Sequence, residues 1–159
     1  MINDSNTEFG KRETIFDVEE GYSFSPKFDE NGLIPVVTTS QSGEVLMHGY
    51  MNSQALKLTL KNKEAYYWSR SRNCLWHKGK TSGLTQKVLN IRVDDDQDSI
   101  WLIVEVLGQG ASCHVGYRSC FYRSVEIDKN GKIRLKFEED KKLFDPEEVY
   151  KGQPNPTKL

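Results

Sequence analysis

The sequence predicts a small, β-rich α+β domain with one main helix, and three observations support this. Short β-branched or aromatic runs recur between turn residues, only the run after Asn52 has helical spacing, and 159 residues suit one domain. We expect residues 29–137 to form this domain. Residues 1–28 lack periodicity and are expected to be an N-terminal extension, and residues 138–159 are charged and contain proline, as in a loosely held tail.

Each expected element is bounded by turn residues or a cap. Asn52 can accept hydrogen bonds from the first amides of a helix, which is expected over residues 53–62. Residues 69–83 are polar, basic and rich in glycine, as in a loop. The predicted strands, with hairpins at Gln41-Ser42-Gly43 and Asn130-Gly131, are 33–39, 44–47, 65–68, 88–93, 99–107, 122–127 and 133–137.

Composition narrows the classes of function. The net charge of -1 argues against a broad cationic surface for a nucleic acid polymer. No apolar run approaches the roughly 20 residues that cross a bilayer, and the polar N-terminus lacks the centre of a signal peptide, so we expect a cytoplasmic protein without a membrane partner. The odd number of cysteines, Cys74, Cys113 and Cys120, suggests thiols or metal ligands rather than disulfides.

An acidic cluster lies between two predicted strands. Asp94, Asp95, Asp96 and Asp98 place four carboxylates within five residues, and a hard divalent cation would relieve their repulsion. On an extended backbone Asp94, Asp96 and Asp98 share one face, while Asp95 points to the other. A solvated acidic turn is the open alternative.

A second cluster combines thiols with an imidazole. Cys113, His114 and Cys120 lie within eight residues and could form half of a soft-metal site, with His114 as a proton carrier. Two buried free thiols and a structural histidine are the open alternative.

A third cluster, residues 68–83, is basic and aromatic. Cationic and amide donors of this segment could hold phosphates, with an indole stacked on a base, whereas an exposed basic loop is the alternative. Its candidate substrate-binding residues are Trp68, Ser69, Arg70, Arg72, Trp76, Lys78, Thr81, Ser82 and Gly83.

The order of these clusters resembles the phosphoribosyl-AMP cyclohydrolase family, which acts in the third step of histidine biosynthesis. The matching blocks, between Gly32 and Arg123, are GEVLM with YMN, YYWSRSRNCLWHKGKTSG, DDDQDSIWL and CHVGYRSCFYR. The resemblance implies a small mixed sheet or pseudobarrel in an intertwined homodimer. It also implies a phosphoribosyl nucleotide as substrate and hydrolysis of the N1–C6 bond of its adenine ring.

The resemblance implies two metal sites as well. Asp94, Asp96 and Asp98 correspond to magnesium ligands, and Cys113 and Cys120 correspond to two of three zinc ligands at the dimer interface. The position of the third zinc cysteine is Asp95 here. Two thiolates and a carboxylate still bind zinc but suit iron or manganese better than three thiolates do, and three protein ligands leave one position open for water.

Other departures lie near the same motifs. Leu84 stands where the family has histidine, Lys80 where it commonly has glutamate, and Val115 and Tyr117 where it commonly has threonine and arginine. Three hypotheses follow: a divergent, zinc-sparing phosphoribosyl-AMP cyclohydrolase; a related enzyme for another purine nucleotide; and an inactive nucleotide-binding module.

Overall fold

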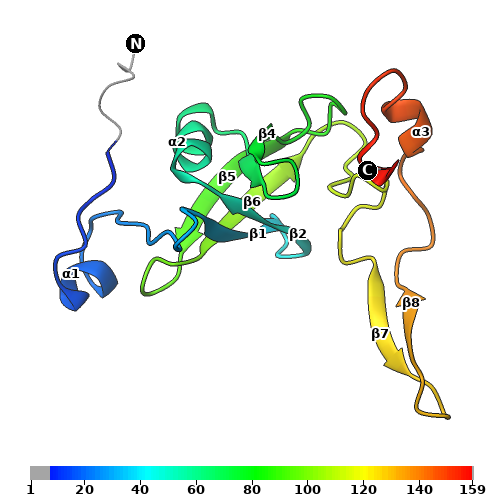
Figure 1. Cartoon of the computed structure of the whole chain (residues 1–159), viewed down its shortest axis with the longest axis horizontal. Helices are drawn as coiled ribbons and strands as arrows, with labels where there is room; N and C mark the ends of the chain where they lie inside the picture. Colours follow the sequence, from blue (N-terminus) through cyan, green and yellow to red (C-terminus); the bar gives the residue numbers. More distant parts are fainter. Residues whose placement is uncertain (1–7, 159) are drawn as a thin grey trace.

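The computed structural model describes residues 8–158 and confirms a β-rich α+β fold with one main helix (Figure 1). The helices are α1 (Ile15–Glu19), α2 (Ser53–Asn62) and α3 (Pro146–Val149), with a 3-10 turn at Pro156–Lys158. The strands are β1 (Ile34–Ser40), β2 (Val45–Met51), β3 (Tyr66–Ser69), β4 (Cys74–His77), β5 (Gln86–Val93), β6 (Ile100–Val106), β7 (Arg123–Ile127) and β8 (Ile133–Phe137).

The main sheet is mixed and has the strand order β2-β1-β6-β5. The central strands β1 and β6 run parallel, and the edge strands β2 and β5 pair with them antiparallel. Alternate residues of β6 are buried, as expected of a strand with one face on the core. The core also takes in Ile34 and Val36 of β1 and Leu56 of α2.

Helix α2 begins and ends as the sequence predicts. The side-chain oxygen of Asn52 accepts from the backbone N–H of Ala55 at 2.9 Å, which satisfies one of the free amides of the first turn. Ala55, Leu56 and Thr59 form the buried face, and Lys63 ends the helix in the left-handed conformation.

The predicted loop at residues 69–83 is partly wrong, because it contains strand β4. β4 pairs antiparallel with β3 in a hairpin whose turn includes Asn73 at a φ of 50°. Tyr67 and Trp76 are partners in this register. Since short loops that join paired strands often need a left-handed residue, Asn73 is the turn signal for this hairpin.

Both flanking segments contact the folded body. The N-terminal segment carries α1 and packs Phe9, Phe24 and Phe28 against the core. The C-terminal segment packs the buried Phe144 against Leu84 and Ala111, so it is not the loosely held tail that its composition predicts. Buried or half-buried phenylalanines therefore hold both segments on the body of the protein, although most of the surrounding residues are polar.

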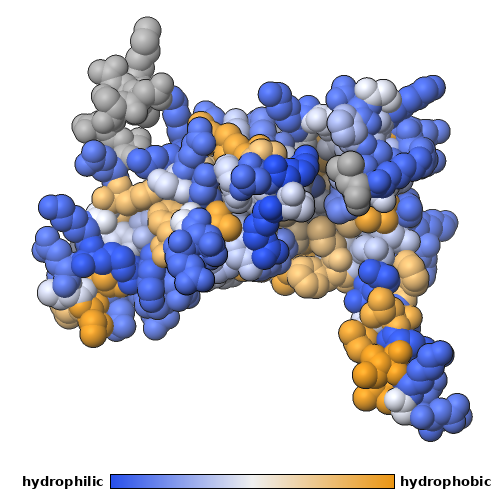
Figure 2. All heavy atoms as spheres, viewed as in Figure 1, coloured by the Kyte–Doolittle hydropathy of each residue, from blue (hydrophilic) through white to orange (hydrophobic). Residues whose placement is uncertain are grey.

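Strands β7 and β8 form a separate ribbon that projects away from the main sheet (Figure 1). Its polar face carries the ion pairs of Glu126 with Arg134 and Lys136. The residues of the apolar face are 50–73% exposed: Val125, Ile127, Ile133, Leu135 and Phe137. Figure 2 shows hydrophobic atoms, in orange, along this ribbon. A two-stranded ribbon of this kind is marginally stable on its own in water. An exposed apolar face of this kind is typical of an interaction surface.

Candidate active site

The acidic turn joins β5 to β6 and is closed by its own first carboxylate. One oxygen of Asp94 accepts from the backbone N–H groups of Asp98 and Ser99, each at 3.0 Å. The carboxylate oxygens of Asp94, Asp95 and Asp96 lie within 4.8 Å of one another, and no other possible metal-ligand group of three was found among residues 8–158.

This grouping differs from the trio expected on an extended strand. Asp95 joins Asp94 and Asp96, because the segment turns instead of alternating its faces. Asp98 lies beside the group, and its hydrogen bond with Asp94 is the main reason why the pKa of Asp98 is raised. The turn therefore offers three closely spaced hard ligands, which suit a divalent cation such as Mg²⁺.

The two thiols lie beyond the other end of β6. Cys113 is buried and its side chain is hydrogen-bonded to that of Cys120, a bond that lowers the pKa of Cys113 to about 6 and raises the pKa of Cys120. The backbone N–H of Cys113 donates to Tyr117 and that of Cys120 donates to Leu46 of β2. The thiol pair is thus tied to the main sheet through the backbone of Cys120.

Lys78 lies against this pair rather than in the solvent. Its side chain is buried, and its ammonium donates to the carbonyl of Ser112 at 2.6 Å. Burial lowers the pKa of Lys78, whereas the charges of Cys120 and Cys113 act in the opposite direction. A buried ammonium needs such partners. Lys78 therefore links residues 112–120, which we call the thiol loop, to the end of β4.

His114 belongs to the same loop as the two cysteines and is half-buried, under the influence of Lys78 and Arg72. Its pKa is lowered, first by burial and then by the positive charges of Lys78 and Arg72. The imidazole is therefore neutral at pH 7 and can accept a proton.

The β3–β4 hairpin, which we call the basic hairpin, places its cations against aromatic rings. Arg70 lies 4.0 Å from the ring centre of Tyr50, and Arg72 lies 5.5 Å from that of Trp76. The hydroxyl of Ser69 accepts from the side chain of Arg72 at 3.1 Å. These contacts hold two guanidinium groups at the surface in defined positions, where anionic groups can reach them.

The other candidates of this segment separate into two groups. Trp68 belongs to β3 beside Ser69, while Thr81 and Gly83 are exposed in the turn before β5. Ser82 forms a hydrogen bond with Tyr150 of the C-terminal segment. Tyr150 had no motif to mark it in the sequence.

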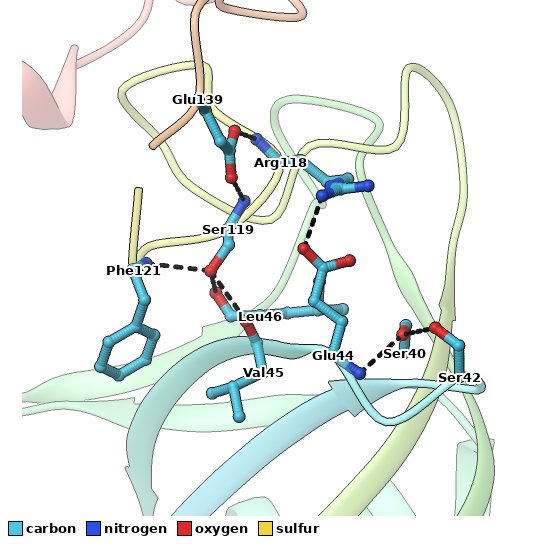
Figure 3. A network of polar contacts seen from close by, with 9 residues as sticks. All are labelled: Ser40, Ser42, Glu44, Val45, Leu46, Arg118, Ser119, Phe121 and Glu139. Atoms are coloured by element: carbon cyan, nitrogen blue, oxygen red, sulfur yellow. Dashed lines mark hydrogen bonds and ion pairs between the residues drawn. The ribbon is translucent and has the colours of Figure 1, made fainter. Parts of the chain in front are cut away.

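A polar network anchors the thiol loop to the start of β2 (Figure 3). The hydroxyl of Ser119 donates to the carbonyl of Val45 at 2.8 Å, and Glu139 accepts from the backbone N–H groups of Arg118 and Ser119 at 2.9 and 3.0 Å. Arg118 also pairs with Glu44 at 2.6 Å. Glu139, from outside the motifs, thus holds the segment that carries Cys120.

The acidic turn and the thiols lie at opposite ends of the sheet within one chain (Figure 1). The seven residues of β6 separate them, and a strand of this length spans about 20 Å. Asp95 therefore does not complete a metal site with Cys113 and Cys120 of the same chain.

Two of the departures from the family motifs are structural. Leu84 is 3% exposed and packs on Phe144, so it belongs to the second apolar cluster. Tyr117 stacks on Tyr122 with ring centres 4.0 Å apart. The structure gives Val115 and Lys80 no comparable packing role.

Comparison with known proteins matches residues 47–122 to the family model for phosphoribosyl-AMP cyclohydrolase. The phosphoribosyl-AMP cyclohydrolase of Bradyrhizobium diazoefficiens is 52% identical over 136 residues, which are 85% of this chain and 95% of the relative. The chain belongs to the phosphoribosyl-AMP cyclohydrolase family.

Two further relatives of the same name support this assignment. The protein of Sinorhizobium fredii is 51% identical over 135 residues, covering 84% of this chain and 88% of the relative. A protein of Rhodopseudomonas palustris is 54% identical over 136 residues, covering 85% and 92%. The cyclohydrolase similarity therefore extends well beyond the residues that match the family model.

No helix among residues 8–158 is long and apolar enough to cross a membrane.

Proposed function

We propose that this chain hydrolyses the N1–C6 bond of the adenine ring of phosphoribosyl-AMP in histidine biosynthesis. The observation that carries this proposal is about 50% identity, over some 85% of the chain, to proteins named phosphoribosyl-AMP cyclohydrolase. The chemistry of the two ends of the sheet supports it, because one supplies hard carboxylates and the other a thiolate, a neutral imidazole and nearby cations. The free thiols fit a reducing compartment such as the cytoplasm.

We propose further that the site is shared between two copies of the chain. The length of β6, about 20 Å for seven residues, separates Asp95 from the thiols of its own chain, but Asp95 could approach those of a second copy. The exposed apolar face of the β7–β8 ribbon supports this arrangement, because a partner would remove it from water. A two-fold dimer would then hold two equivalent sites.

The residues fit the metals that the family implies. Cys113 and Cys120 are neighbours and one is readily a thiolate, so they would hold Zn²⁺, Fe²⁺ or Mn²⁺ together with Asp95 of the second copy. Asp94 and Asp96, with Asp98 beside them, would hold Mg²⁺. A transition metal with an open position would supply Lewis-acid activation of water at the thiol end.

The chain's own side chains would bind the substrate and move protons. The guanidinium groups of Arg70 and Arg72 are held at the surface by aromatic rings and would pair with phosphates. Neutral His114 would accept the proton that water loses and return it to the opened ring. Lys78 would hold the thiol loop through Ser112.

A first experiment tests the reaction itself. Purified protein supplied with Zn²⁺, Fe²⁺ or Mn²⁺, and Mg²⁺, should open phosphoribosyl-AMP, and the gene should restore growth of a cyclohydrolase-deficient strain without histidine. We expect His114→Ala to lower kcat by about 100-fold or more, as loss of a proton-transfer group does. A well-folded, metal-loaded protein with no turnover of phosphoribosyl-AMP would contradict the proposed function.

A second experiment tests the shared site by mixing subunits. Asp95→Ala and Cys113→Ala should each inactivate the protein, because each breaks both sites of a dimer. When the two variants are co-expressed, half of the dimers are mixed and each holds one intact site, so about a quarter of the wild-type activity should return. No recovery in isolated mixed dimers would contradict a shared site.

A third experiment tests whether Asp95 is a metal ligand. We expect Asp95→Cys to bind zinc more tightly, since a third thiolate is a softer ligand than a carboxylate, and to lose activity with Mn²⁺ relative to Zn²⁺. Competition with a chromophoric chelator measures the affinity, and Asp128→Cys in the β7–β8 turn is the matched control. Equal zinc affinity in wild type and Asp95→Cys would place Asp95 outside the metal site.

A further inference from the structure

Gln97 lies among the four aspartates of the acidic turn, yet its side chain is directed away from them into the protein. It is 5% exposed, and its amide oxygen accepts from the backbone N–H of Ser25 at 2.7 Å. Its amide nitrogen donates to the carbonyls of Val18 at 2.9 Å and Ser23 at 3.2 Å. All three partners belong to the N-terminal segment, more than 70 residues earlier in the chain.

The backbone of Gln97 is also held by this segment. Its carbonyl accepts from the backbone N–H of Lys27 at 2.8 Å. Gln97 has a φ of 58°, in the left-handed region that residues other than glycine seldom adopt. Four hydrogen bonds to the N-terminal segment therefore stabilise a backbone conformation that is intrinsically unfavourable.

The same segment brings two cations to the turn. Arg12 donates to the carbonyl of Ser25 at 2.6 Å and to that of Asp96 at 2.8 Å, so one guanidinium bridges the segment and the turn. The ammonium of Lys27 lies 3.9 Å from the carboxylate of Asp96. These charges oppose the mutual repulsion of the aspartates.

The segment is itself fixed to the body of the protein. Phe9 packs edge-on against Phe24 with ring centres 5.6 Å apart, and both contact the main core together with Phe28. Residues 18–24 and the acidic turn also enclose an open pocket of about 390 Å³. The acidic turn is therefore bonded to a segment that is itself packed on the core.

We propose that residues 9–28 are a positioning element of the acidic site, which hold Asp94, Asp95 and Asp96 in their ligand arrangement before a cation binds. Gln97 and Arg12 are the positioning residues. That the arrangement serves a divalent cation rests on the proposed function, whereas the coupling between this segment and the turn does not. Pre-arranged carboxylates would bind a cation more tightly, because less chain entropy is lost on binding.

Hydrogen exchange of full-length, metal-free protein tests the coupling directly. The amides of Asp98 and Ser99 are protected by Asp94 when the turn is formed. We expect Gln97→Ala and Arg12→Ala to accelerate their exchange by about 10-fold or more, while the amides of β1 and β6 exchange as in the wild type. Gln54→Ala, on the exposed start of α2, is the matched control and should change nothing.

Gln97→Gly separates the side chain from the backbone. Glycine adopts a positive φ freely but lacks the three side-chain hydrogen bonds, so exchange should still accelerate. Wild-type exchange in Gln97→Gly would show that backbone conformation alone sets the turn and would overturn the proposal. Unchanged exchange in both Gln97 variants would overturn it as well.

Binding of Mn²⁺ alone, followed by electron paramagnetic resonance, tests the consequence for the site. We expect the Kd for the acidic turn to rise by about 3- to 10-fold in Gln97→Ala and Arg12→Ala. Faster exchange together with wild-type Mn²⁺ affinity would overturn the positioning role. If the wild type binds no Mn²⁺ at this turn, the proposed metal site fails, and the exchange rates still decide whether the N-terminal segment holds the turn.

Discussion

The two ends of β6 carry the two halves of the proposed site, and they are held in different ways. The acidic turn is fixed from the outside, by Gln97 and Arg12 with the N-terminal segment. The thiol loop is held by buried side chains of the domain, because Lys78 and Gln86 both donate hydrogen bonds to Ser112. The supporting N-terminal segment and Glu139 lie outside residues 47–122, which match the family model.

This difference separates local order from global stability. Loss of a contact at the acidic turn should loosen a surface turn and leave the core intact. Loss of a contact at the thiol loop removes partners of buried polar groups or displaces packed backbone, so it should lower the free energy of unfolding of the whole domain.

The largest effect is expected when the acidic turn of one copy is kept apart from the thiol loop of the other. Ile127→Lys combined with Leu135→Lys places two charges on the exposed apolar face of the ribbon. We expect this variant to be a folded monomer with its activity abolished, since the charges cannot be buried at an interface without a partner. Sedimentation velocity and turnover assays measure both properties.

The polar face of the same ribbon provides the control. Ser124→Ala with Lys136→Ala changes the opposite face and should leave a dimer with wild-type activity. A fully active monomer of the lysine variant would show that one chain contains a complete site. In that case Asp95 would not be a ligand of the metal held by Cys113 and Cys120.

The next largest effect concerns the C-terminal segment at the thiol loop. Gly116 has a φ of 107°, its carbonyl accepts from the N–H of Leu143 at 2.7 Å, and a Cβ there would lie 2.4 Å from the carbonyl oxygen of Phe144. We expect Gly116→Ala to lower the free energy of unfolding by about 3 kcal/mol or more, combining backbone strain with displacement of the segment. Urea denaturation measures this change.

Gly43 offers a matched control for that substitution. It also has a positive φ, 88°, but nothing lies within 4 Å of an added Cβ. Gly43→Ala should therefore cost only the backbone term of about 1–2 kcal/mol. Equal losses in the two variants would mean that close contact with the C-terminal segment does not stabilise the thiol loop.

A smaller effect is expected at Glu139, which accepts from two backbone N–H groups of the same loop. Glu139→Gln retains one acceptor oxygen but turns an NH₂ group toward an N–H donor, so we expect a loss of about 1–2 kcal/mol. Glu138→Gln, whose exposed carboxylate contacts Ser124 and Lys136, should change stability little. A loss of the same size in both variants would point to general charge effects.

The sequence predicted most of the elements but only part of the site. Asn52 and the apolar spacing after it located α2, and Asn130-Gly131 located the β7–β8 hairpin, because these signals are local. β4 was missed because its four residues lie in a polar, glycine-rich segment and are defined by pairing with β3. Pairing between strands is a tertiary property that composition does not encode.

The composition of the acidic group shows a second limit. Alternation along a strand predicted that Asp94, Asp96 and Asp98 would share a face, whereas the turn at Gln97 gathers Asp94, Asp95 and Asp96. Gln97 adopts its conformation through Ser25 and Val18, which are distant in sequence. A pattern that treats five residues in isolation cannot contain that information.

An effect of similar size is expected at Tyr67, where the core meets the thiol end of the sheet. The hydroxyl of Tyr67 donates to Gln86 at 2.7 Å and therefore accepts from Thr38, also at 2.7 Å. Gln86 continues the chain of bonds to Ser112. Tyr67→Phe leaves the amide oxygen of Gln86 and the hydroxyl of Thr38 without this buried partner, and we expect a loss of about 1–2 kcal/mol at pH 7.

The pH dependence of that loss gives a sharper test. Burial raises the pKa of Tyr67 in the folded protein, so above about pH 10 the unfolded chain loses a proton that the folded chain retains. The wild type should then lose about 1.4 kcal/mol of stability per pH unit relative to Tyr67→Phe, which has no proton to lose. The difference between the two variants must therefore shrink as the pH rises through 10 to 11. A constant difference, measured by urea denaturation, would mean that the Tyr67 hydroxyl ionises as in solution and that the polar network beneath the thiol loop is open to water.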